Sequence, residues 1–258
     1  MDFSPIPVSD KKFLNYIFIG IVVGDKPVTA MFDTRGNTLI PQSLADELDL
    51  TYIDKEPIDE VRGFRRAKLK KMALGGLKLE GVPVVVCKDK VIDLGEDQFG
   101  NKFPADMILG WNIISQFVFR GDLRKGQIEV QTSDFKKSKR KGKDNTPVFK
   151  IVFEGRVYKA AIDTSRPLTI ISEYIYDKIK IENKDIKQTI DMLDIDHDDV
   201  MYETKFSFKI DDNIVNIPTT QVEKELNDKD IQVVFGIDLL RNTSWAMYNP
   251  MGYFRARN

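Results

Sequence analysis

The sequence is poor in the residues that build most disulfides and metal sites. It has one cysteine, Cys87, and one histidine, His197. A single cysteine excludes an intramolecular disulfide and is typical of proteins from reducing compartments. A single histidine argues against a multi-histidine metal site and against a Ser-His-Asp triad. We therefore expect no metal ion and no other cofactor.

The sequence also lacks an excess of one charge and any long apolar run. Its net charge of −1 gives no general attraction to nucleic acids or anionic membranes. No uncharged run approaches the roughly 18 residues that span a bilayer, and the first residues lack the features of a signal peptide. We expect a cytoplasmic protein without nucleic-acid or membrane partners. Six Lys or Arg residues within 136–143 indicate a solvated linker, with a contact to nucleic acid or an acidic partner as the alternative.

Two pairs of matching segments are present instead. Residues 31–34 read MFDT and residues 161–164 read AIDT, so their aspartates lie 130 positions apart. Further along, MILGWNII at 107–114 matches VVFGIDLL at 233–240. Matches in the same order at nearly the same spacing indicate an internal duplication. We predict two lobes, residues 1–133 and 147–258, joined by the basic linker 134–146.

The local patterns predict strands in both halves. Short apolar runs rich in β-branched residues alternate with turns that contain glycine, proline and asparagine. One hairpin is expected to join residues 67–74 to 77–87 across two glycines. Residues 1–12, with prolines at 5 and 7, are expected to be an irregular arm. The fold class is therefore all-β, with only short helices.

The two aspartates suggest a chemistry. An Asp-Thr pair at the end of one strand would ordinarily be a turn or cap. Two equivalent halves, however, usually pack about an approximate two-fold axis, which brings such residues together. Two carboxylates at about 3 Å cannot both ionise, so they share a proton. The ionised group can then activate water while the protonated group donates to a carbonyl, which is general acid–base hydrolysis of an amide.

In these motifs the sequence resembles the retropepsin-like aspartic proteases, with two such halves fused in one chain. The resemblance implies a bilobal pepsin-like fold of two duplicated β-barrel-like halves, and an aspartic endopeptidase that acts on a peptide or protein. It implies that Asp33 and Asp163 are catalytic and that Thr34 and Thr164 hold their loops together. Because the site forms within one chain as a pseudo-dimer, a monomer is expected.

The resemblance also implies flaps over the cleft, at residues 61–70 and 188–204. The flap candidates are Gly63, Phe64, Met192 and Leu193.

Two residues depart from the family pattern, in which glycine follows Asp-Thr. Arg35 occupies this position in the first half and Ser165 in the second. Ser165 is small, but the charge of Arg35 beside Asp33 would favour the ionised carboxylate and oppose proton sharing. The sequence thus leaves an alternative open, a catalytically inactive protein that binds an extended peptide or partner protein in the cleft.

Overall fold

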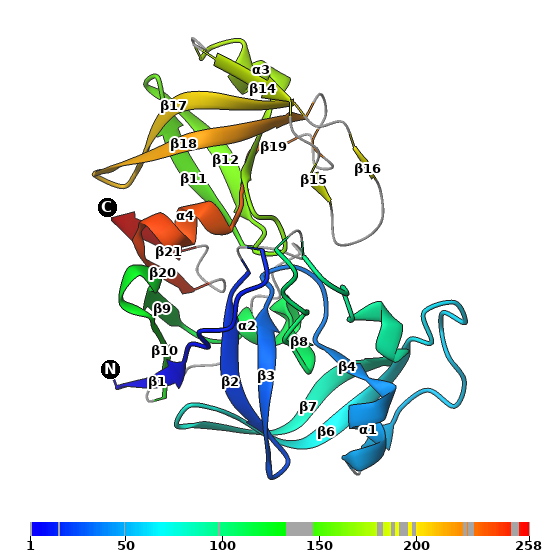
Figure 1. Ribbon diagram of the computed structural model, residues 1–258. Helices are drawn as coiled ribbons and strands as arrows, with labels where there is room; N and C mark the ends of the chain where they lie inside the picture. Colours follow the sequence, from blue (N-terminus) through cyan, green and yellow to red (C-terminus); the bar gives the residue numbers. More distant parts are fainter. Residues whose placement is uncertain are drawn as a thin grey trace.

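A computed structural model gives the architecture of the chain. It describes residues 2–132 and 147–257, except residues 15, 49, 98, 180–182, 187–188, 191–195, 198–199, 224–225, 227–229 and 249–252. The described residues form two lobes, one above the other, with a third sheet along one side of both (Figure 1). Strands dominate and the helices are short, so the predicted two-lobed all-β architecture is confirmed.

The first lobe is a seven-stranded sheet in the order β2-β3-β8-β4-β7-β6-β5. Pairing of β2 with β6 closes it into a barrel. The strands are β2 (Phe18–Val23), β3 (Lys26–Phe32), β4 (Leu39–Pro41), β5 (Thr51–Tyr52), β6 (Arg65–Leu74), β7 (Leu77–Cys87) and β8 (Met107–Leu109). Helices α1 (Gln42–Glu47) and α2 (Trp111–Ile114) follow β4 and β8, and a 3-10 turn η1 (Asp89–Val91) follows β7.

The second lobe repeats this order as β11-β12-β19-β13-β18-β17-β14, and β11 pairs with β17 where β2 pairs with β6. Its strands are β11 (Val148–Phe153), β12 (Arg156–Ile162), β13 (Thr169–Ser172), β14 (Asn183–Ile186), β17 (Val200–Ile210), β18 (Asn213–Glu223) and β19 (Ile231–Phe235). Helices α3 (Glu173–Tyr176) and α4 (Ile237–Asn242) occupy the places of α1 and α2, and β15 (Thr189–Ile190) pairs with β16 (Asp196–His197). The two lobes therefore share one topology.

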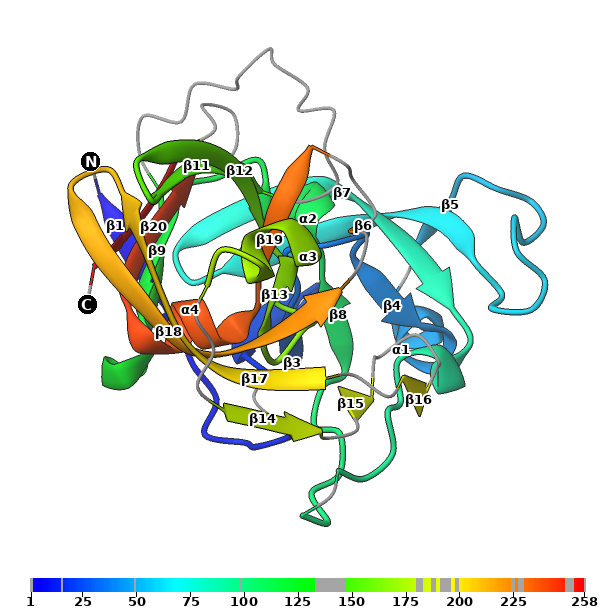
Figure 2. The same cartoon turned by 90° about the horizontal axis from the view of Figure 1, so that it is seen from above.

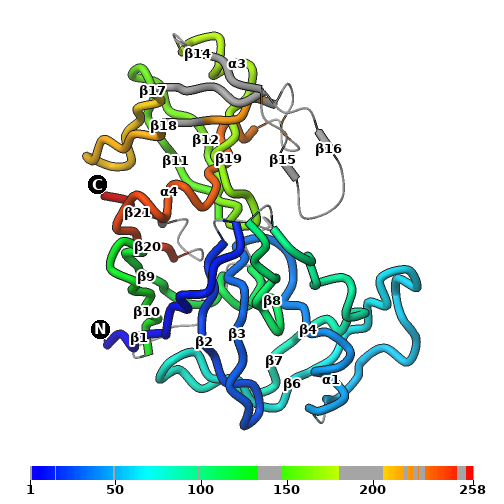
Figure 3. Tube along the Cα trace, in the orientation of Figure 1, coloured from blue at the N-terminus to red at the C-terminus, as the bar shows by residue number. Residues whose placement is uncertain are grey.

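The third sheet takes strands from both halves, in the order β1-β10-β9-β20-β21. These strands are β1 (Phe3–Pro7), β10 (Gln127–Gln131), β9 (Phe119–Asp122), β20 (Ser244–Tyr248) and β21 (Tyr253–Arg257), with the 3-10 turn η2 (Leu123–Lys125) between β9 and β10. Seen from above, both chain ends lie beside this sheet (Figure 2), and the tube shows the same arrangement (Figure 3). The first and last strands of the chain thus border one shared sheet.

The prediction of an irregular arm at residues 1–12 is wrong for its middle part, because β1 pairs in register with β10. Proline cannot donate to a strand ladder, but β1 is an edge strand with one paired side, where proline is tolerated. The side chain of Ile6 is buried in the core and fixes the strand in place.

The core runs through the shared sheet into both lobes. The ring of Phe32, the last residue of β3, lies 5.5 Å from that of Phe119 and 6.4 Å from that of Trp245. On the other side, the rings of Phe149 in β11 and Phe254 in β21 are 4.6 Å apart. Contacts of this kind favour burial and restrict orientation, so the shared sheet packs against the strands that lead to the aspartate loops.

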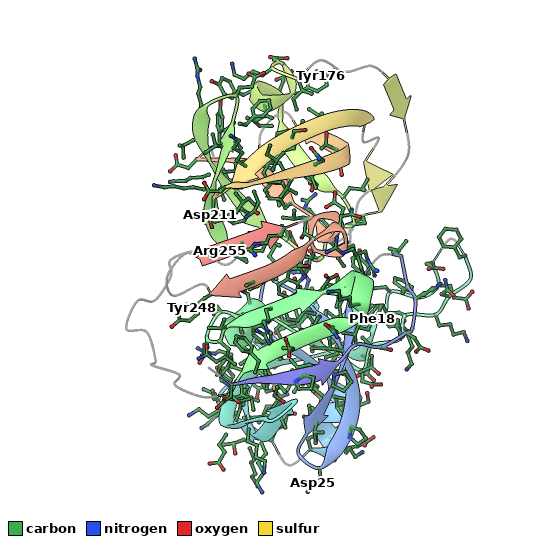
Figure 4. The ribbon with its side chains drawn as sticks, turned by 90° about the vertical axis from the view of Figure 1, so that its left-hand side faces the viewer. Phe18, Asp25, Tyr176, Asp211, Tyr248 and Arg255 are labelled. Atoms are coloured by element: carbon green, nitrogen blue, oxygen red, sulfur yellow. The ribbon has the colours of Figure 1, made fainter. Side chains whose placement is uncertain are left out.

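The outer surface of the shared sheet is polar at its β21 edge. Figure 4 looks onto this surface, with Tyr248 and Arg255 labelled on neighbouring strands. The Nε of Arg255 donates to Oδ2 of Asp211, in the turn between β17 and β18, at 2.9 Å. An exposed pair of this kind contributes little stability, so the buried rings rather than this ion pair join the sheet to the second lobe.

The glycine that follows β8 should not tolerate a side chain. A Cβ on Gly110 would lie 2.5 Å from the backbone nitrogen of Thr38, which cannot move aside as a flexible side chain would. We expect Gly110→Ala to lower the free energy of unfolding by about 3 kcal/mol, measured by urea denaturation. Gly20→Ala is the control, because its Cβ would make an ordinary contact at 3.5 Å with Pro7. Equal losses in the two variants would contradict this packing argument.

Candidate active site

The two aspartates lie at equivalent places in the two lobes. Asp33 follows β3, and its backbone N–H donates to the carbonyl of Leu109 at 3.0 Å. Asp163 follows β12, and its N–H donates to the carbonyl of Phe235 at 2.9 Å. Each aspartate is thus fixed by the parallel strand beside it, β8 or β19. The glycine motifs at 107–110 and 233–236 supply these strands.

Two threonines join the aspartate loops across the lobes. The backbone N–H of Thr34 donates to Oγ1 of Thr164 at 2.9 Å, and the reverse bond measures 3.0 Å. The Thr34 hydroxyl donates to the carbonyl of Ile162 at 3.0 Å, and the Thr164 hydroxyl donates to that of Phe32 at 2.7 Å. Both threonines have no exposed surface. These four reciprocal bonds hold the loops together about an approximate two-fold axis.

Arg35 contacts both aspartates. Its backbone N–H donates to Oδ1 of Asp33 at 2.8 Å, and its Nη1 donates to Oδ2 of Asp163 at 2.9 Å. The sequence placed the charge of Arg35 beside Asp33, but the guanidinium makes its ion pair with the aspartate of the other lobe. The Asp163 side chain is only 2% exposed, so its carboxylate depends on protein donors.

Two further residues of the second loop contact Asp163. The backbone N–H and the hydroxyl of Ser165 both donate to its Oδ1, at 3.0 and 2.5 Å. The Nε of Arg166 lies 3.7 Å from its Oδ2. Ser165 therefore replaces the family's glycine and adds a donor. Arg166 was missed, and its position three residues after the aspartate was the only signal in the sequence.

The electrostatics of the pair are unequal. Burial raises the pKa of Asp33 well above its usual value, and the nearby charge of Asp163 raises it further. The N–H of Arg35 and the charge of its guanidinium lower it in part. A raised pKa favours the neutral acid at Asp33, while two guanidinium groups face the carboxylate of Asp163. The surroundings of the two carboxyl groups are therefore different.

Comparison with known protein families identifies the first lobe. The model of the aspartyl protease family matches residues 19–113, a range that contains Asp33 and the strand β8 behind it. Residues 19–113 belong to the aspartyl protease family. The match supports a protease-type function, and the bilobal all-β architecture agrees with an aspartic protease fold. A comparison with curated proteins gave no significant match.

Behind each aspartate loop of this aspartyl protease architecture lies a second pair of equivalent bonds. In the first lobe, Oδ1 of Asn112 accepts from the N–H and hydroxyl of Thr38, at 2.7 and 2.8 Å. In the second lobe, the carboxylate of Asp238 accepts from the same groups of Thr169, at 2.9 and 2.8 Å. The two lobes share this hydrogen-bond arrangement, but the acceptor differs: Asp238 can ionise and Asn112 cannot. Burial raises the pKa of Asp238 to about 6 despite these hydrogen bonds.

The flap candidates of the first lobe lie in a turn before β6. Gly63 adopts a left-handed φ of 71°, and Phe64 packs partly buried against the first lobe rather than standing free. The Nζ of Lys88 donates to the carbonyls of Glu60 and Val61, at 2.8 and 3.1 Å. Residues 53–64 project from the lobe as a loop (Figure 1). Met192 and Leu193, the candidates of the second lobe, lie outside the described residues.

Within the described part of the chain, no group of three or more His, Cys, Asp or Glu side chains is arranged to hold a metal ion. No helix in the same part is long and apolar enough to cross a membrane. Cys87, Trp111 and Trp245 are buried among apolar side chains. Burial raises the pKa of the Cys87 thiol to about 12, so the thiolate form of this cysteine is disfavoured.

The raised pKa of Asp238 predicts a stability that falls with pH. Between its unfolded value of 3.8 and its folded value of about 6, the folded chain binds more protons than the unfolded chain. The free energy of unfolding should therefore decrease as pH rises through this range, by about 2 to 3 kcal/mol in total. We expect Asp238→Asn to remove this decrease, so that the two stability curves converge or cross between pH 4 and pH 7. Parallel curves in chemical denaturation would contradict the shift.

Proposed function

We propose that this protein is an aspartic endopeptidase in which Asp33 and Asp163 hydrolyse peptide bonds through a bound water. One observation carries the proposal: the buried threonine bonds and Arg35 join two aspartates that occupy equivalent loops of the two lobes. The family match of the first lobe supports the same class of reaction. The shared strand order supports a duplicated origin for the second lobe and the division into residues 1–133 and 147–258.

The unequal pair suggests which aspartate takes which role. A water between the carboxyl groups would lose a proton to Asp163 as it attacks the peptide carbonyl. Asp33 would donate its proton to the carbonyl oxygen, giving a tetrahedral diol. Return of the proton from Asp163 to the leaving nitrogen would then break the C–N bond and release an amine and an acid. As the C–N bond breaks, one hydroxyl proton of the diol returns to Asp33, so the pair ends with the protonation that it had at the start and no covalent intermediate forms.

Asp163 retains one acceptor position for a water in addition to its hydrogen-bond partners. A carboxylate offers about four acceptor positions, and the hydrogen bonds described above use three of them, from Ser165 N–H, Ser165 Oγ and Arg35 Nη1. On Asp33, the described hydrogen bond reaches Oδ1 and comes from Arg35. Oδ2 of each aspartate is therefore the proposed position for contact with water.

The substrate is expected to be an extended peptide that pairs with the flap strands, since such peptides commonly bind by adding a strand to a sheet edge. A monomer suffices for this site, because both aspartates come from one chain. A cytoplasmic setting without nucleic-acid partners remains the expectation from composition.

A second function is favoured by the ion pair between Arg35 and Asp163. The guanidinium bonds to Oδ2, the oxygen that would accept the proton from water. If this bond persists when peptide enters, Asp163 would be a weak base, and the protein would bind peptides without cleaving them.

Cleavage of a peptide library separates the two functions. We expect cleavage between pH 4 and pH 8 that a statine-type transition-state analogue inhibits. Asp33→Asn and Asp163→Asn should each lower the rate by at least about a hundredfold, because each removes one partner of the acid–base pair. Circular dichroism should show that both variants remain folded. Full activity in either folded variant would refute the pair, and binding of peptide without cleavage at any pH would establish the second function.

A further inference from the structure

Arg35 stands where the family pattern has glycine, and it is the residue whose backbone and side chain contact different aspartates. Its N–H bonds to Asp33 in its own loop, and its guanidinium crosses to Asp163 in the other lobe. The Arg35 side chain is 46% exposed, whereas that of Asp163 is 2% exposed. The positive charge of a partly exposed guanidinium thus lies against a carboxylate that solvent hardly reaches.

Asp33 and Asp163 face different charged and hydrogen-bonding groups. From the loop after β12, Arg166 and the two donors of Ser165 face Asp163. From the loop after β3, the Arg35 guanidinium faces Asp163, and its N–H faces Asp33. From behind, β8 and β19 present the backbone carbonyls of Leu109 and Phe235 to the N–H groups of the aspartates. From α4, the carboxylate of Asp238 accepts from Thr169, at the end of the loop that carries Asp163.

We propose that Arg35 is a positioning residue that replaces symmetric proton sharing with a fixed division, in which Asp163 carries the negative charge and Asp33 carries the proton. Protonation of Asp163 would leave a guanidinium against a neutral acid and give up a charge-assisted hydrogen bond. Protonation of Asp33 leaves the Arg35 bond to Oδ1 intact, because the proton can reside on Oδ2. The two protonation states therefore differ in energy, although the loops that hold the aspartates have equivalent backbones.

This division explains why a bulky cation can occupy the position of a glycine. The family's glycine permits close approach of the backbone to the carboxylates, and Arg35 keeps that contact through its own N–H at 2.8 Å. The side chain then leaves toward the other lobe instead of crowding Asp33. Arg35 would act through the two aspartates and would not itself react with substrate. The kinetic consequence rests on the proposed function, but the division of charge does not.

The division can be measured without any cleavage. Aspartate labelled with 13C at the carboxyl carbon reports the ionisation of Asp33 and Asp163, with Asp33→Asn and Asp163→Asn assigning the two signals. In the wild type we expect a pH range in which the Asp163 signal is that of a carboxylate and the Asp33 signal is that of a neutral acid. Arg35→Met keeps an unbranched side chain without the charge. In this variant the pH interval between the titrations of Asp163 and Asp33 should shrink by about one to two pH units. Arg35→Lys should restore part of it.

The kinetic arm applies if the protein cleaves peptides. At acidic pH, Arg35→Met should lower kcat by about tenfold, the change expected for a one-unit shift, while KM changes by less than about twofold. Arg35→Lys should fall between the two. A purely structural role would lower activity equally at every pH and leave the carboxyl titrations unchanged, and that result in folded Arg35→Met would overturn the proposal.

The two arms separate this inference from the proposed function. Altered titrations in a protein that cleaves no peptide would uphold the role of Arg35 and refute the peptidase. Cleavage with identical titrations and identical pH profiles in wild type and Arg35→Met would uphold the peptidase and refute the role of Arg35.

Discussion

The site depends on the reciprocal bonds between two buried threonines. Each of the hydroxyls of Thr34 and Thr164 accepts one backbone N–H and donates to one backbone carbonyl from the opposite loop. Buried polar groups without partners are costly, so neither loop is satisfied unless both lobes are in place. The same requirement that pairs these groups brings Asp33 and Asp163 together. Assembly of the site is therefore a consequence of satisfying the backbone at the lobe interface.

The shared sheet gives this interface its rigidity. Its strands come from both halves and include residues near each end of the chain, β1 and β21, as its opposite borders. The rings of Phe119 and Trp245 in this sheet pack against Phe32, which immediately precedes Asp33. Packed side chains of this kind fix the positions of the strands, so β9 and β20 of the shared sheet support the loop that carries Asp33.

The sequence was sufficient for those features that repeat. Two features predicted the two equivalent lobes: apolar strands that end in Asp-Thr, and later strands that end in glycine. Each motif corresponds to a local geometry. The aspartate follows a strand, and the glycine lies where the backbone of Asn37 or Leu168 leaves no room for a Cβ. What could not be predicted depends on the positions that the chain takes in the folded molecule. The direction of Arg35 and the pairing of β1 are set by partners far away in the chain, and local pattern carries no information about them. Arg166 lies only three residues from Asp163, but the sequence does not show that its side chain turns back toward that carboxylate.

The departures from symmetry carry the chemistry. A perfectly duplicated pair of loops would give both aspartates the same surroundings, and the proton would have no preferred side. Arg35 in the first lobe occupies the position of Ser165 in the second, so a cation stands where the other lobe has a hydroxyl. Asn112 occupies the position of Asp238, so a neutral amide stands where the other lobe has a carboxyl group. Because the backbone bonds are equivalent in both lobes, the difference between the carboxyls comes from side chains such as these, together with Arg166 beside Asp163. The shared topology thus supplies the frame, and in the proposed mechanism the differences at a few positions within it determine which aspartate donates and which accepts.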